Sequence, residues 1–356
     1  MLTRFEVKNF RCFRELALTE LERVNLITGK NNVGKTSLLE ALHLHCLPDK
    51  PHLWIKINKL RGIDDPFRAI DELGSWLFFQ GETEGSIAIA SYDSDSVERV
   101  TDFFFVDATT SREKFPDVEK KVANAFRSDI AGSDARRLIV RYQSEGKQYE
   151  SVALATERNT TRFGFHVPNP LPTAYLASLI ADSKRDVGHF GELETAKRLG
   201  EIIPSLQILE PKLTRLSLVP LAGETVIHGD IEGMPRLVPL PLIGEGMRRV
   251  LSMVLAIANV PGGIVFLDEF ENGLHYSVLS KVWQAVADAA RRNDVQVFAT
   301  THSWECLRAA HEAFSQEGES YDFRMHRLER QDGDVTCVTY DRELIETSLA
   351  MGLEVR

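Results

Sequence analysis

The sequence is poor in the features that mark disulfide-rich, zinc-binding or membrane proteins. It has four cysteines in 356 residues and no Cys-x-x-Cys pair, so neither a zinc site nor a disulfide framework is indicated. It has no arginine-rich leader, no signal-peptide core and no apolar run long enough to cross a bilayer. We therefore predict a cytoplasmic protein with no membrane segment.

Long heptad repeats and an excess of positive charge are also missing. Without sustained heptads, long coiled-coil arms of the kind that tether DNA are not expected. The formal net charge of −10 argues against a surface built mainly to hold nucleic acid, although a local basic patch is compatible with it. The chain is 43% hydrophobic and 26% charged, so it can bury a full core without disulfide bonds or structural metals.

A glycine-bounded loop follows a short apolar strand near the N-terminus. Residues 24–27 (VNLI) are typical of a buried strand, and residues 29–36 (GKNNVGKT) fit the pattern G-x-x-x-x-G-K-[ST] at every fixed position. The glycines permit unusual backbone angles, and the loop N–H groups with the next helix N-terminus form an anion cradle. We predict that the phosphates of ATP are held by Gly29, Lys30, Asn31, Asn32, Val33, Gly34, Lys35, Thr36 and Ser37.

Two residues of this loop have separate predicted roles. Lys35 is expected to reach the β- and γ-phosphates and to act in catalysis, and the Thr36 hydroxyl is expected to ligate Mg²⁺. A GTPase would add Asn-Lys-x-Asp downstream of its Asp-x-x-Gly, and the sequence has no such pair in that order. ATP and Mg²⁺ are therefore the expected cofactors.

An acidic cluster lies far along the chain, in GGIVFLDEFENGLH at residues 262–275. Four apolar residues there are typical of a central parallel strand, and the run ends in Asp268 and Glu269. Open α/β sheets bind ligands at the carboxyl ends of their strands. We expect Asp268 to hold the Mg²⁺ and Glu269 to polarise the attacking water. The alternative, a strand end with solvated acids, becomes improbable beside the loop at 29–36.

Two further segments favour the same edge of a sheet. An apolar strand ends in TTHS at residues 300–303, where His302 could contact the γ-phosphate or lie half-buried beside a helix start. Gly244, Glu245 and Gly246 precede a helix with apolar periodicity, which indicates a second phosphate-binding turn or a flexible hinge. The LHLHC run after the loop offers at most two ligands on one helix face, so an ordinary helix is predicted there.

Together these stretches resemble the ABC-type ATPases of the SMC, RecF and OLD group, and in particular a standalone AAA family ATPase branch related to OLD nucleases. The resemblance begins at FEVKNFRCFRELALTELERVNLITGKNNVGKTSLLEAL. It resumes at GEGMRRVLSMVLAIANVPGGIVFLDEFENGLHYSVL and FATTHS, and ends at EVR. These segments cover about a third of the chain, at both ends, and the middle carries little motif.

The resemblance implies further roles for individual residues. Glu269 would be the catalytic glutamate, His302 the switch histidine, and residues 271–275 the D-loop. Residues 244–247 would be the signature motif, although Gly244 stands where the group usually has a serine. Arg11 would contact the adenosine half, and Gln80 would be a Q-loop glutamine near the metal, or else an ordinary exposed strand-end residue.

In this group the signature of one subunit completes the P-loop site of another. The resemblance therefore implies a homodimer that holds two nucleotides head to tail in an isologous arrangement. It leaves open whether such dimers assemble into a higher oligomer. Each chain would carry half of two sites. A monomer would bind ATP but hydrolyse it poorly, because a missing transition-state donor costs about 10²–10³ in rate.

The predicted fold is α/β, a mixed sheet flanked by helices with an inserted antiparallel β and helical lobe. Residues 1–47 and 236–356 would form the two halves of the ATPase core, and residues 48–235 the insertion. Strands are expected at 85–93, 97–108, 135–143 and 149–156, and helices at 116–128 and at 191–209 up to its proline. The tail predicts a hairpin and a short helix, too little for a TOPRIM nuclease domain, so no nuclease chemistry is expected in this chain.

Three function classes follow from the sequence. The first is a nucleotide-driven dimer switch that controls a separate effector, such as a nuclease, in prokaryotic defence against phage or foreign DNA. The second is a RecF-like repair ATPase that binds DNA directly, which the acidic balance disfavours. The third is a nucleotide-gated scaffold with negligible turnover, which the glycine at position 244 leaves open.

Overall fold

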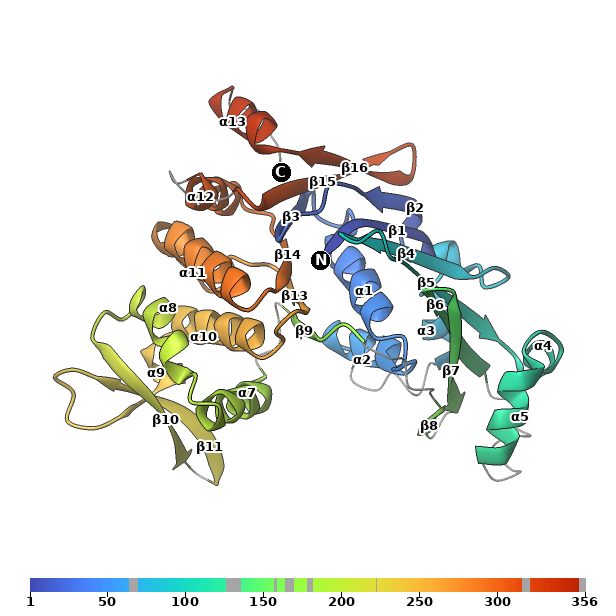
Figure 1. Cartoon of the computed structure of the whole chain (residues 1–356), viewed down its shortest axis with the longest axis horizontal. Coiled ribbons are helices and arrows are strands. Elements are labelled where there is room, and N and C mark those ends of the chain that lie inside the picture. The colour runs from blue at the N-terminus through green and yellow to red at the C-terminus, as the bar shows by residue number, and fades with distance from the viewer. Residues whose placement is uncertain are drawn as a thin grey trace.

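The chain folds around helix α1 (Lys35–Cys46), which lies between two β-sheets (Figure 1). The computed structural model describes residues 1–63, 70–125, 136–156, 159–163, 170–177, 182–221, 223–315 and 321–351. The predicted α/β fold, with a mixed core sheet flanked by helices and an antiparallel β-rich part, is confirmed.

The central sheet has the strand order β16-β15-β3-β14-β13-β9. β16 runs antiparallel to β15, and all the other neighbours are parallel. Every residue of β3, β13 and β14 is buried, as expected for parallel strands covered on both faces. The strands are β3 (Val24–Gly29), β9 (Thr173–Leu176), β13 (Ile264–Leu267), β14 (Gln296–Thr300), β15 (Phe323–Gln331) and β16 (Asp334–Tyr340).

The parallel register brings the carboxyl ends of these strands to one edge. Leu267 of β13 pairs with Ala299 of β14, and Thr300 pairs with Ile27 of β3. On the other side of β3, Leu328 of β15 pairs with Gly29. The loops after β3, β13 and β14 therefore start side by side, although they are far apart in the sequence.

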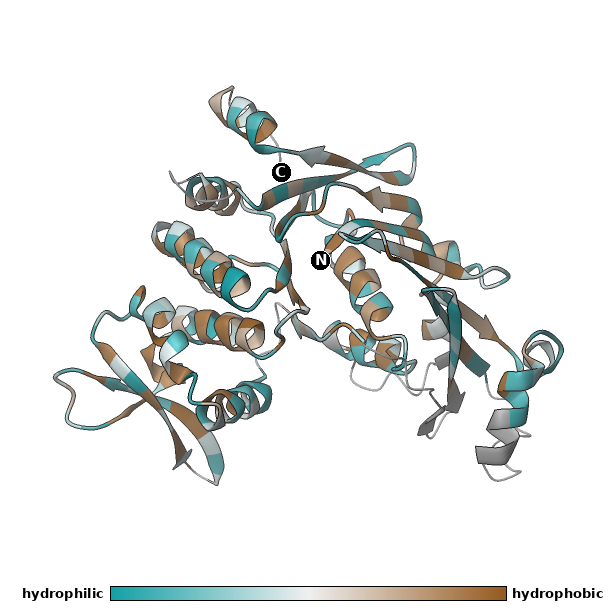
Figure 2. Ribbon diagram, in the orientation of Figure 1, coloured by the Kyte–Doolittle hydropathy of each residue, from teal (hydrophilic) through white to brown (hydrophobic). Residues whose placement is uncertain are grey.

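Helices cover both faces of the central sheet because successive strand residues point to opposite sides. Val265 and Leu267 of β13 face the core shared with α7, α10, α11 and α12, whereas Ile264 and Phe266 face the core around α1. Hydrophobic and polar residues both occur along the ribbons of α10 and α11 (Figure 2), and the hydrophobic residues of both helices are largely buried, whereas α10 also buries Arg249 and Ser252. These helices are α7 (Ser183–Thr195), α10 (Glu245–Ala258), α11 (Leu279–Arg292) and α12 (Trp304–Phe314).

The second sheet is antiparallel, with the order β2-β1-β4-β5-β6-β7-β8. The strands predicted at 85–93, 97–108, 135–143 and 149–156 are confirmed as β4 to β7. Its strands are β1 (Leu2–Phe10), β2 (Phe13–Leu18), β4 (Ile87–Asp93), β5 (Glu98–Val106), β6 (Arg136–Ser144), β7 (Lys147–Thr156) and β8 (Asn159–Phe163).

The predicted insertion contributes strands to both sheets. β4 pairs with β1, so the strands from the middle of the chain extend the sheet that the N-terminal hairpin begins. β9 lies at the edge of the central sheet beside β13. The division into segments 1–47, 48–235 and 236–356 stays a prediction.

The remaining elements belong to neither of these two sheets. They include a third sheet of β10 (Leu213–Leu221), β11 (Glu224–Ile231) and β12 (Val238–Pro239), the helices α2 (Leu53–Leu60), α3 (Ile70–Ser75), α4 (Ala108–Lys114), α5 (Pro116–Ala125), α8 (Ile203–Gln207), α9 (Leu240–Ile243) and α13 (Arg342–Ala350), and the single turns η2 (Phe79–Gly81), η3 (Leu199–Glu201) and η4 (Tyr276–Val278). The predicted C-terminal hairpin and helix are confirmed as β15, β16 and α13. In the part of the chain described, no helix combines the length and apolarity needed to cross a bilayer.

One predicted helix was placed wrongly. The sequence predicted a helix from residue 191 to the proline at 204, whereas α7 begins at Ser183 and ends at Thr195. The Asp182 carboxylate accepts a hydrogen bond from the N–H of Arg185, which fixes the earlier start. Pro204 does not end a helix but lies in the first turn of α8, where its missing N–H costs nothing. The helix predicted at 116–128 is α5, and residues 126–128 lie outside the described residues.

His45 joins α1 to the antiparallel sheet. Its ring nitrogens lie 2.8 Å from Thr101 Oγ1 on β5 and 2.8 Å from Ser91 Oγ on β4. The neighbouring His43 packs edge-on against Tyr175 and Phe266 instead. The prediction of an ordinary helix over LHLHC is therefore confirmed, and these histidines serve the packing of α1.

This packing predicts a pH dependence of stability. Burial lowers the pKa of His45 to about 3, so the unfolded chain takes up a proton near pH 6.5 and the folded protein does not. Stability is fully present above that pH and falls as the pH is lowered toward 3, by about 2 kcal/mol between pH 7 and pH 5 for this one group. Urea unfolding of the wild type and of His45→Gln should give a shallower pH dependence in the variant. Equal slopes would contradict the assignment.

Candidate functional site

The loop between β3 and α1 requires glycine at both ends. Gly29 has a φ of 134° and Gly34 a φ of 113°, a backbone region that side chains disfavour. A Cβ at position 29 would lie 2.5 Å from the carbonyl oxygen of Leu328, and one at position 34 would lie 2.6 Å from Cys12 Sγ. The loop is thus held tightly between β15 and the turn after β1, and α1 begins directly at Lys35.

The Lys35 side chain lies along the inside of this loop. Its Nζ donates to the carbonyls of Gly29 at 2.7 Å and of Lys30 at 3.1 Å. Burial lowers the pKa of Lys35, and the nearby carboxylates of Asp268, Glu271 and Glu269 act in the opposite direction. The ammonium group therefore already lies between the loop and the acidic cluster that follows β13.

Asp268 is the centre of the hydrogen bonds at this edge. The Thr36 hydroxyl is 3.2 Å from each carboxylate oxygen, and the Thr300 hydroxyl donates to Oδ1 at 2.7 Å. The residue is buried, and burial raises the pKa of Asp268 while the two threonines act against that rise. A hydroxyl beside a buried carboxylate is the hard oxygen donor set that suits Mg²⁺. Thr36 and Asp268 therefore fit the predicted metal.

Glu269 follows in a constrained backbone conformation. Its φ is 48°, in the left-handed region. Its N–H donates to Thr300 Oγ1 at 2.8 Å, and its carbonyl accepts from Arg249 at 3.1 Å. The next residue, Phe270, stacks on Trp283 of α11 at a centroid distance of 3.6 Å. These contacts fix the turn that carries the carboxylate.

His302 is oriented by the loop after β13. Glu271 Oε1 accepts from the His302 backbone N–H at 3.1 Å and lies 3.2 Å from its ring Nδ1. The His302 side chain is 55% exposed, so the rest of its ring faces solvent at the edge of the sheet. The structure thus brings Lys35, Thr36, Asp268, Glu269 and His302 together at one edge.

The turn of residues 244–246 contacts the loop after Asp268 in its own chain. A Cβ on Gly246 would lie 3.0 Å from the carbonyl oxygen of Gly273, and one on Gly273 would lie 3.0 Å from Cγ of Glu245. Gly244 has a φ of 150° and open space around the position of a Cβ. The turn opens α10 and has one face free.

Among the described contacts, none joins Arg11 or Gln80 to the side chains of Lys35, Thr36, Asp268, Glu269 or His302. Arg11 is held against α1 by Glu40, at 2.8 Å, and by Asn58 of α2, at 3.3 Å. Arg61 also binds Glu40, at 2.7 Å, and reaches Ser37 Oγ at 3.2 Å. Gln80 is exposed in η2 with a φ of 57° and, among the described contacts, none joins it to Thr36 or Asp268. Roles for Arg11 and Gln80 at the nucleotide stay predictions.

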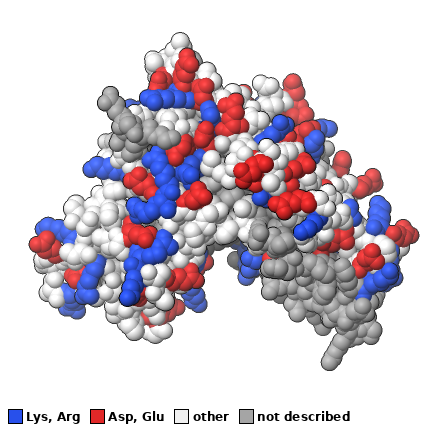
Figure 3. Space-filling model, viewed as in Figure 1, with Lys and Arg blue, Asp and Glu red and all other residues white. Residues whose placement is uncertain are grey.

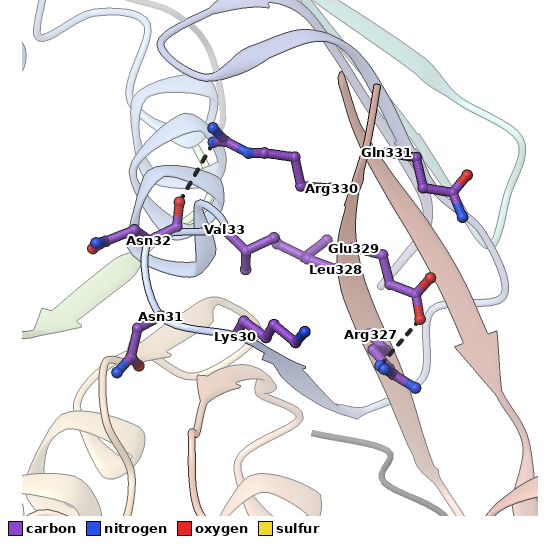
Figure 4. A pocket seen from close by; sticks show the side chains of 9 residues that line it. All are labelled: Lys30, Asn31, Asn32, Val33, Arg327, Leu328, Glu329, Arg330 and Gln331. Carbon is purple, nitrogen blue, oxygen red and sulfur yellow. Dashed lines mark hydrogen bonds and ion pairs between the residues drawn. The ribbon is translucent and has the colours of Figure 1, made fainter. Parts of the chain in front are cut away.

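A cavity of about 480 Å³ lies beside the loop of residues 29–36, on the side that faces β15 (Figure 4). Arg330 Nη2 lies 3.5 Å from the carbonyl oxygen of Asn32, and Arg327 pairs with Glu329 at 3.1 Å. The lining is polar and carries more positive than negative charge. It consists of Lys30, Asn31, Asn32, Val33, Arg327, Leu328, Glu329, Arg330 and Gln331.

Sequence reasoning missed several residues that support the site. Arg249 and Glu40 are charged residues buried among apolar ones, and nothing in the spacing of a helical pattern separates them from surface charges. Thr300 ends an apolar strand beside His302, and a hydroxyl at that position was a usable signal. Arg327 and Arg330 lie three residues apart on β15, which is not the two-residue period of a strand face, and only the pairing of β15 with β3 brings them beside the loop.

The topology and the loop chemistry define a P-loop nucleoside triphosphatase. Its loop follows β3, which lies between β14 and β15, and Asp268 follows β13, which lies on the other side of β14. The family profile described as "AAA domain, putative AbiEii toxin, Type IV TA system" matches residues 24–307. The chain belongs to this family, and the predicted AAA-type P-loop ATPase class is confirmed.

The chain is also similar to individual known proteins and solved structures, over different shares of its length. The "ATP/GTP phosphatase" of Helicobacter pylori is 22% identical over 376 residues, covering 97% of each chain. The "DNA replication and repair protein RecF" of Idiomarina loihiensis is 53% identical over 38 residues, or 11% of each chain. The SMC head domain from Thermotoga maritima aligns with a TM-score of 0.45 at 12% identity over 96% of this chain and 99% of that one. The SMC head bound to the C-winged helix domain of ScpA aligns with a TM-score of 0.49 at 13% identity over 99% of both chains.

The described residues contain no cluster of three or more histidine, cysteine, aspartate or glutamate side chains that could hold a metal ion by itself. Thr36 and Asp268 offer oxygen atoms at this edge, and in nucleotide sites phosphate oxygens and water complete the ligands of Mg²⁺.

The buried charge of Asp268 predicts the effect of removing it. Because its pKa is raised in the folded state, ionised Asp268 costs stability as the pH rises through that value. Asp268→Asn is expected to raise the melting temperature of the nucleotide-free protein at neutral pH, with a gain that shrinks as the pH is lowered. Mg²⁺ with ATP should then stabilise the wild type and not the variant.

The measurement is thermal unfolding with and without Mg²⁺ and ATP. Asp288→Asn on the exposed side of α11 is the matched control, and it should behave as the wild type does. A lower melting temperature for Asp268→Asn at neutral pH would contradict the electrostatic assignment.

Proposed function

We propose that this protein hydrolyses ATP with Mg²⁺ and uses the cycle to switch a dimer. The observation that carries the proposal is the hydrogen bond of the Thr36 hydroxyl to the buried Asp268. It joins the loop after β3 to the end of β13, as a shared metal site requires. Mg²⁺ would neutralise charge on the β- and γ-phosphates between these two residues.

Each remaining side chain at the edge has a role that its contacts support. Lys35 would exchange its two carbonyl partners for phosphate oxygens. Glu269, fixed at its backbone, would accept a proton from the attacking water. His302, held through Nδ1 by Glu271, would present Nε2 to the γ-phosphate or to that water.

A second copy of the chain is the proposed partner at residues 244–246. Two exposed apolar side chains come from the segments at this turn: Leu242, two residues before Gly244, is 77% exposed, and Tyr276, three residues after the Gly273 that Glu245 contacts, is 67% exposed. Exposed apolar side chains beside the turn of residues 244–246 favour a protein–protein contact that buries them. Across a two-fold axis the N–H groups at the start of α10 would face the partner's γ-phosphate, so that Gly244, Glu245 and Gly246 contribute through the backbone and replace the missing serine hydroxyl.

The cavity beside β15 is the proposed place of the nucleoside. Thr36 and Asp268 define the metal end of the phosphates on the β13 side, so the nucleoside leaves toward the opposite side of the loop. The cavity there has arginine side chains rather than an aromatic platform, and a guanidinium stacks on any base. The name of the H. pylori relative, "ATP/GTP phosphatase", supports a pocket that accepts both purines.

The biological setting is proposed from the family. Its description names a toxin of a toxin–antitoxin system, which supports an OLD-like defence ATPase that controls a separate effector. Direct DNA binding of RecF type is the second candidate, and the short RecF match favours it. Acidic and basic side chains are interspersed over the face in Figure 3, which supports the effector over the DNA.

Removing the proposed base tests the dimer switch. Glu269→Gln is expected to bind ATP, to lose about 10²-fold or more in turnover, and to accumulate as an ATP-bound dimer, because hydrolysis no longer opens it. Light scattering with and without ATP, beside steady-state hydrolysis, measures both effects. Adding Leu242→Glu should keep ATP binding and prevent the dimer. Full-speed turnover of Glu269→Gln would remove Glu269 as the base.

The nucleoside cavity has its own test. Arg330→Ala is expected to weaken binding of ATP and GTP by a similar factor of about 10, because one charged contact is lost. It should leave binding of inorganic tripolyphosphate unchanged, since the phosphate loop is intact. Arg324→Ala at the other end of β15 is the matched control, and Lys35→Ala should lose all three ligands. Unchanged ATP affinity in Arg330→Ala would overturn the cavity assignment alone.

A further inference from the structure

Arg249 connects helix α10 to the turn that carries the proposed base. Its guanidinium is buried and donates to the carbonyl of Asp268 at 2.6 Å and to the carbonyl of Glu269 at 3.1 Å. A third, longer contact at 3.5 Å reaches the carbonyl of Ala177, just after β9. One side chain thus holds the ends of two neighbouring strands of the central sheet.

These two carbonyls lie where the backbone departs from ordinary geometry. Glu269 has its φ at 48°, and a residue other than glycine in that region is kept there by its surroundings. The Thr300 hydroxyl holds the N–H of Glu269 on one side, and Arg249 holds its carbonyl on the other. The direction of the Glu269 carboxylate therefore depends on both partners.

Stability alone does not account for this arginine. Burial lowers the pKa of its guanidinium and the Asp268 carboxylate acts against that shift. Among the described residues its Nε is buried without a hydrogen-bond partner. A buried charge with an unsatisfied donor costs free energy that an apolar side chain would not. The arginine instead supplies direction: its terminal nitrogen Nη2, fixed in the guanidinium plane, donates to two consecutive carbonyls.

The same helix begins at the turn proposed to meet the partner's nucleotide. Glu245 and Gly246 contact Gly273 in the loop after Asp268, and Arg249 lies one helical turn further along α10. A shift of this helix start would therefore reach the Glu269 turn through a direct hydrogen bond as well as through van der Waals contact.

We propose that Arg249 is a positioning residue that fixes Glu269 for hydrolysis and transmits movement of the α10 start to it. Through Arg249, the state of the turn at 244–246 in one chain sets the geometry of the base in the same chain. Occupancy of one nucleotide site of the dimer thereby influences the other. This inference rests on the proposed ATPase function.

The experiment compares Arg249→Met and Arg249→Lys with the wild type as full-length proteins. Arg249→Met is expected to lower kcat about 10²-fold, the size of effect that a misplaced catalytic group produces. KM and the ATP dissociation constant should change less than threefold, and one nucleotide should still bind per chain. Arg249→Lys, which can still donate to a carbonyl, should recover part of the lost kcat.

Arg198→Met is the matched control. Arg198 donates to the carbonyl of Ala258 at the other end of α10 and makes no described contact with residues 268–269. It tests whether loosening the helix is sufficient, and its kcat should remain within threefold of the wild type. In the Glu269→Gln background, adding Arg249→Met should leave the residual rate unchanged, because the arginine acts through Glu269.

The outcomes separate this inference from the proposed function. A wild type that hydrolyses ATP, together with an Arg249→Met variant of unchanged kcat, would overturn the positioning role and leave the ATPase intact. A fall in kcat that is matched by an equal fall in nucleotide stoichiometry would reduce Arg249 to a folding role. A wild type with no hydrolysis, or a Lys35→Ala variant with normal ATP affinity, would overturn the ATPase function itself.

Discussion

The hydrogen bonds of the Asp268 carboxylate to Thr36 and Thr300 hold together the three segments on which the geometry of the candidate site depends. Each partner comes from a different part of the chain: the end of β13, the start of α1 and the end of β14. A buried carboxylate with only two hydroxyl partners is costly, since burial raises its pKa. The fold tolerates that cost at a place where a divalent cation would offset it, which ties the local instability to the proposed function.

The position of α1 follows from a second constraint. The buried side chains of α1 are shared between the central and the antiparallel sheets, and His45 hydrogen-bonds to β4 and β5. The first turn of α1 supports the loop of residues 29–36. Glu40 of α1 forms ion pairs with both Arg11 and Arg61. The loop is therefore supported on both sides, by β15 through Leu328 and by the turn after β1 through Cys12. Such a preformed cradle loses little entropy when it binds phosphates.

The patterned parts of the chain were predictable. The strands β3 and β14 are short apolar runs that end in Gly29 and Thr300, and β13 is a similar run that Asp268 follows directly. Each has its chemistry at the carboxyl end. The strands of the antiparallel sheet were located by their alternation. The start of α7 was not, because the helix there begins at an Asp182 cap among polar residues, and the proline at 204 begins a helix instead of ending one. Local patterns do not distinguish those two uses of proline.

By itself the sequence determined the P-loop, the acid at the end of a buried strand, and the AAA-type class, because each rests on residue types at fixed local spacing. Only the tertiary structure decided that Arg249 meets the carbonyls of Asp268 and Glu269, that Arg11 turns to Glu40, and that β15 lines a cavity beside the loop. These contacts join residues whose separation along the chain is set by sheet order and register. Sheet order is fixed by how the whole core packs, and no local stretch of sequence encodes it.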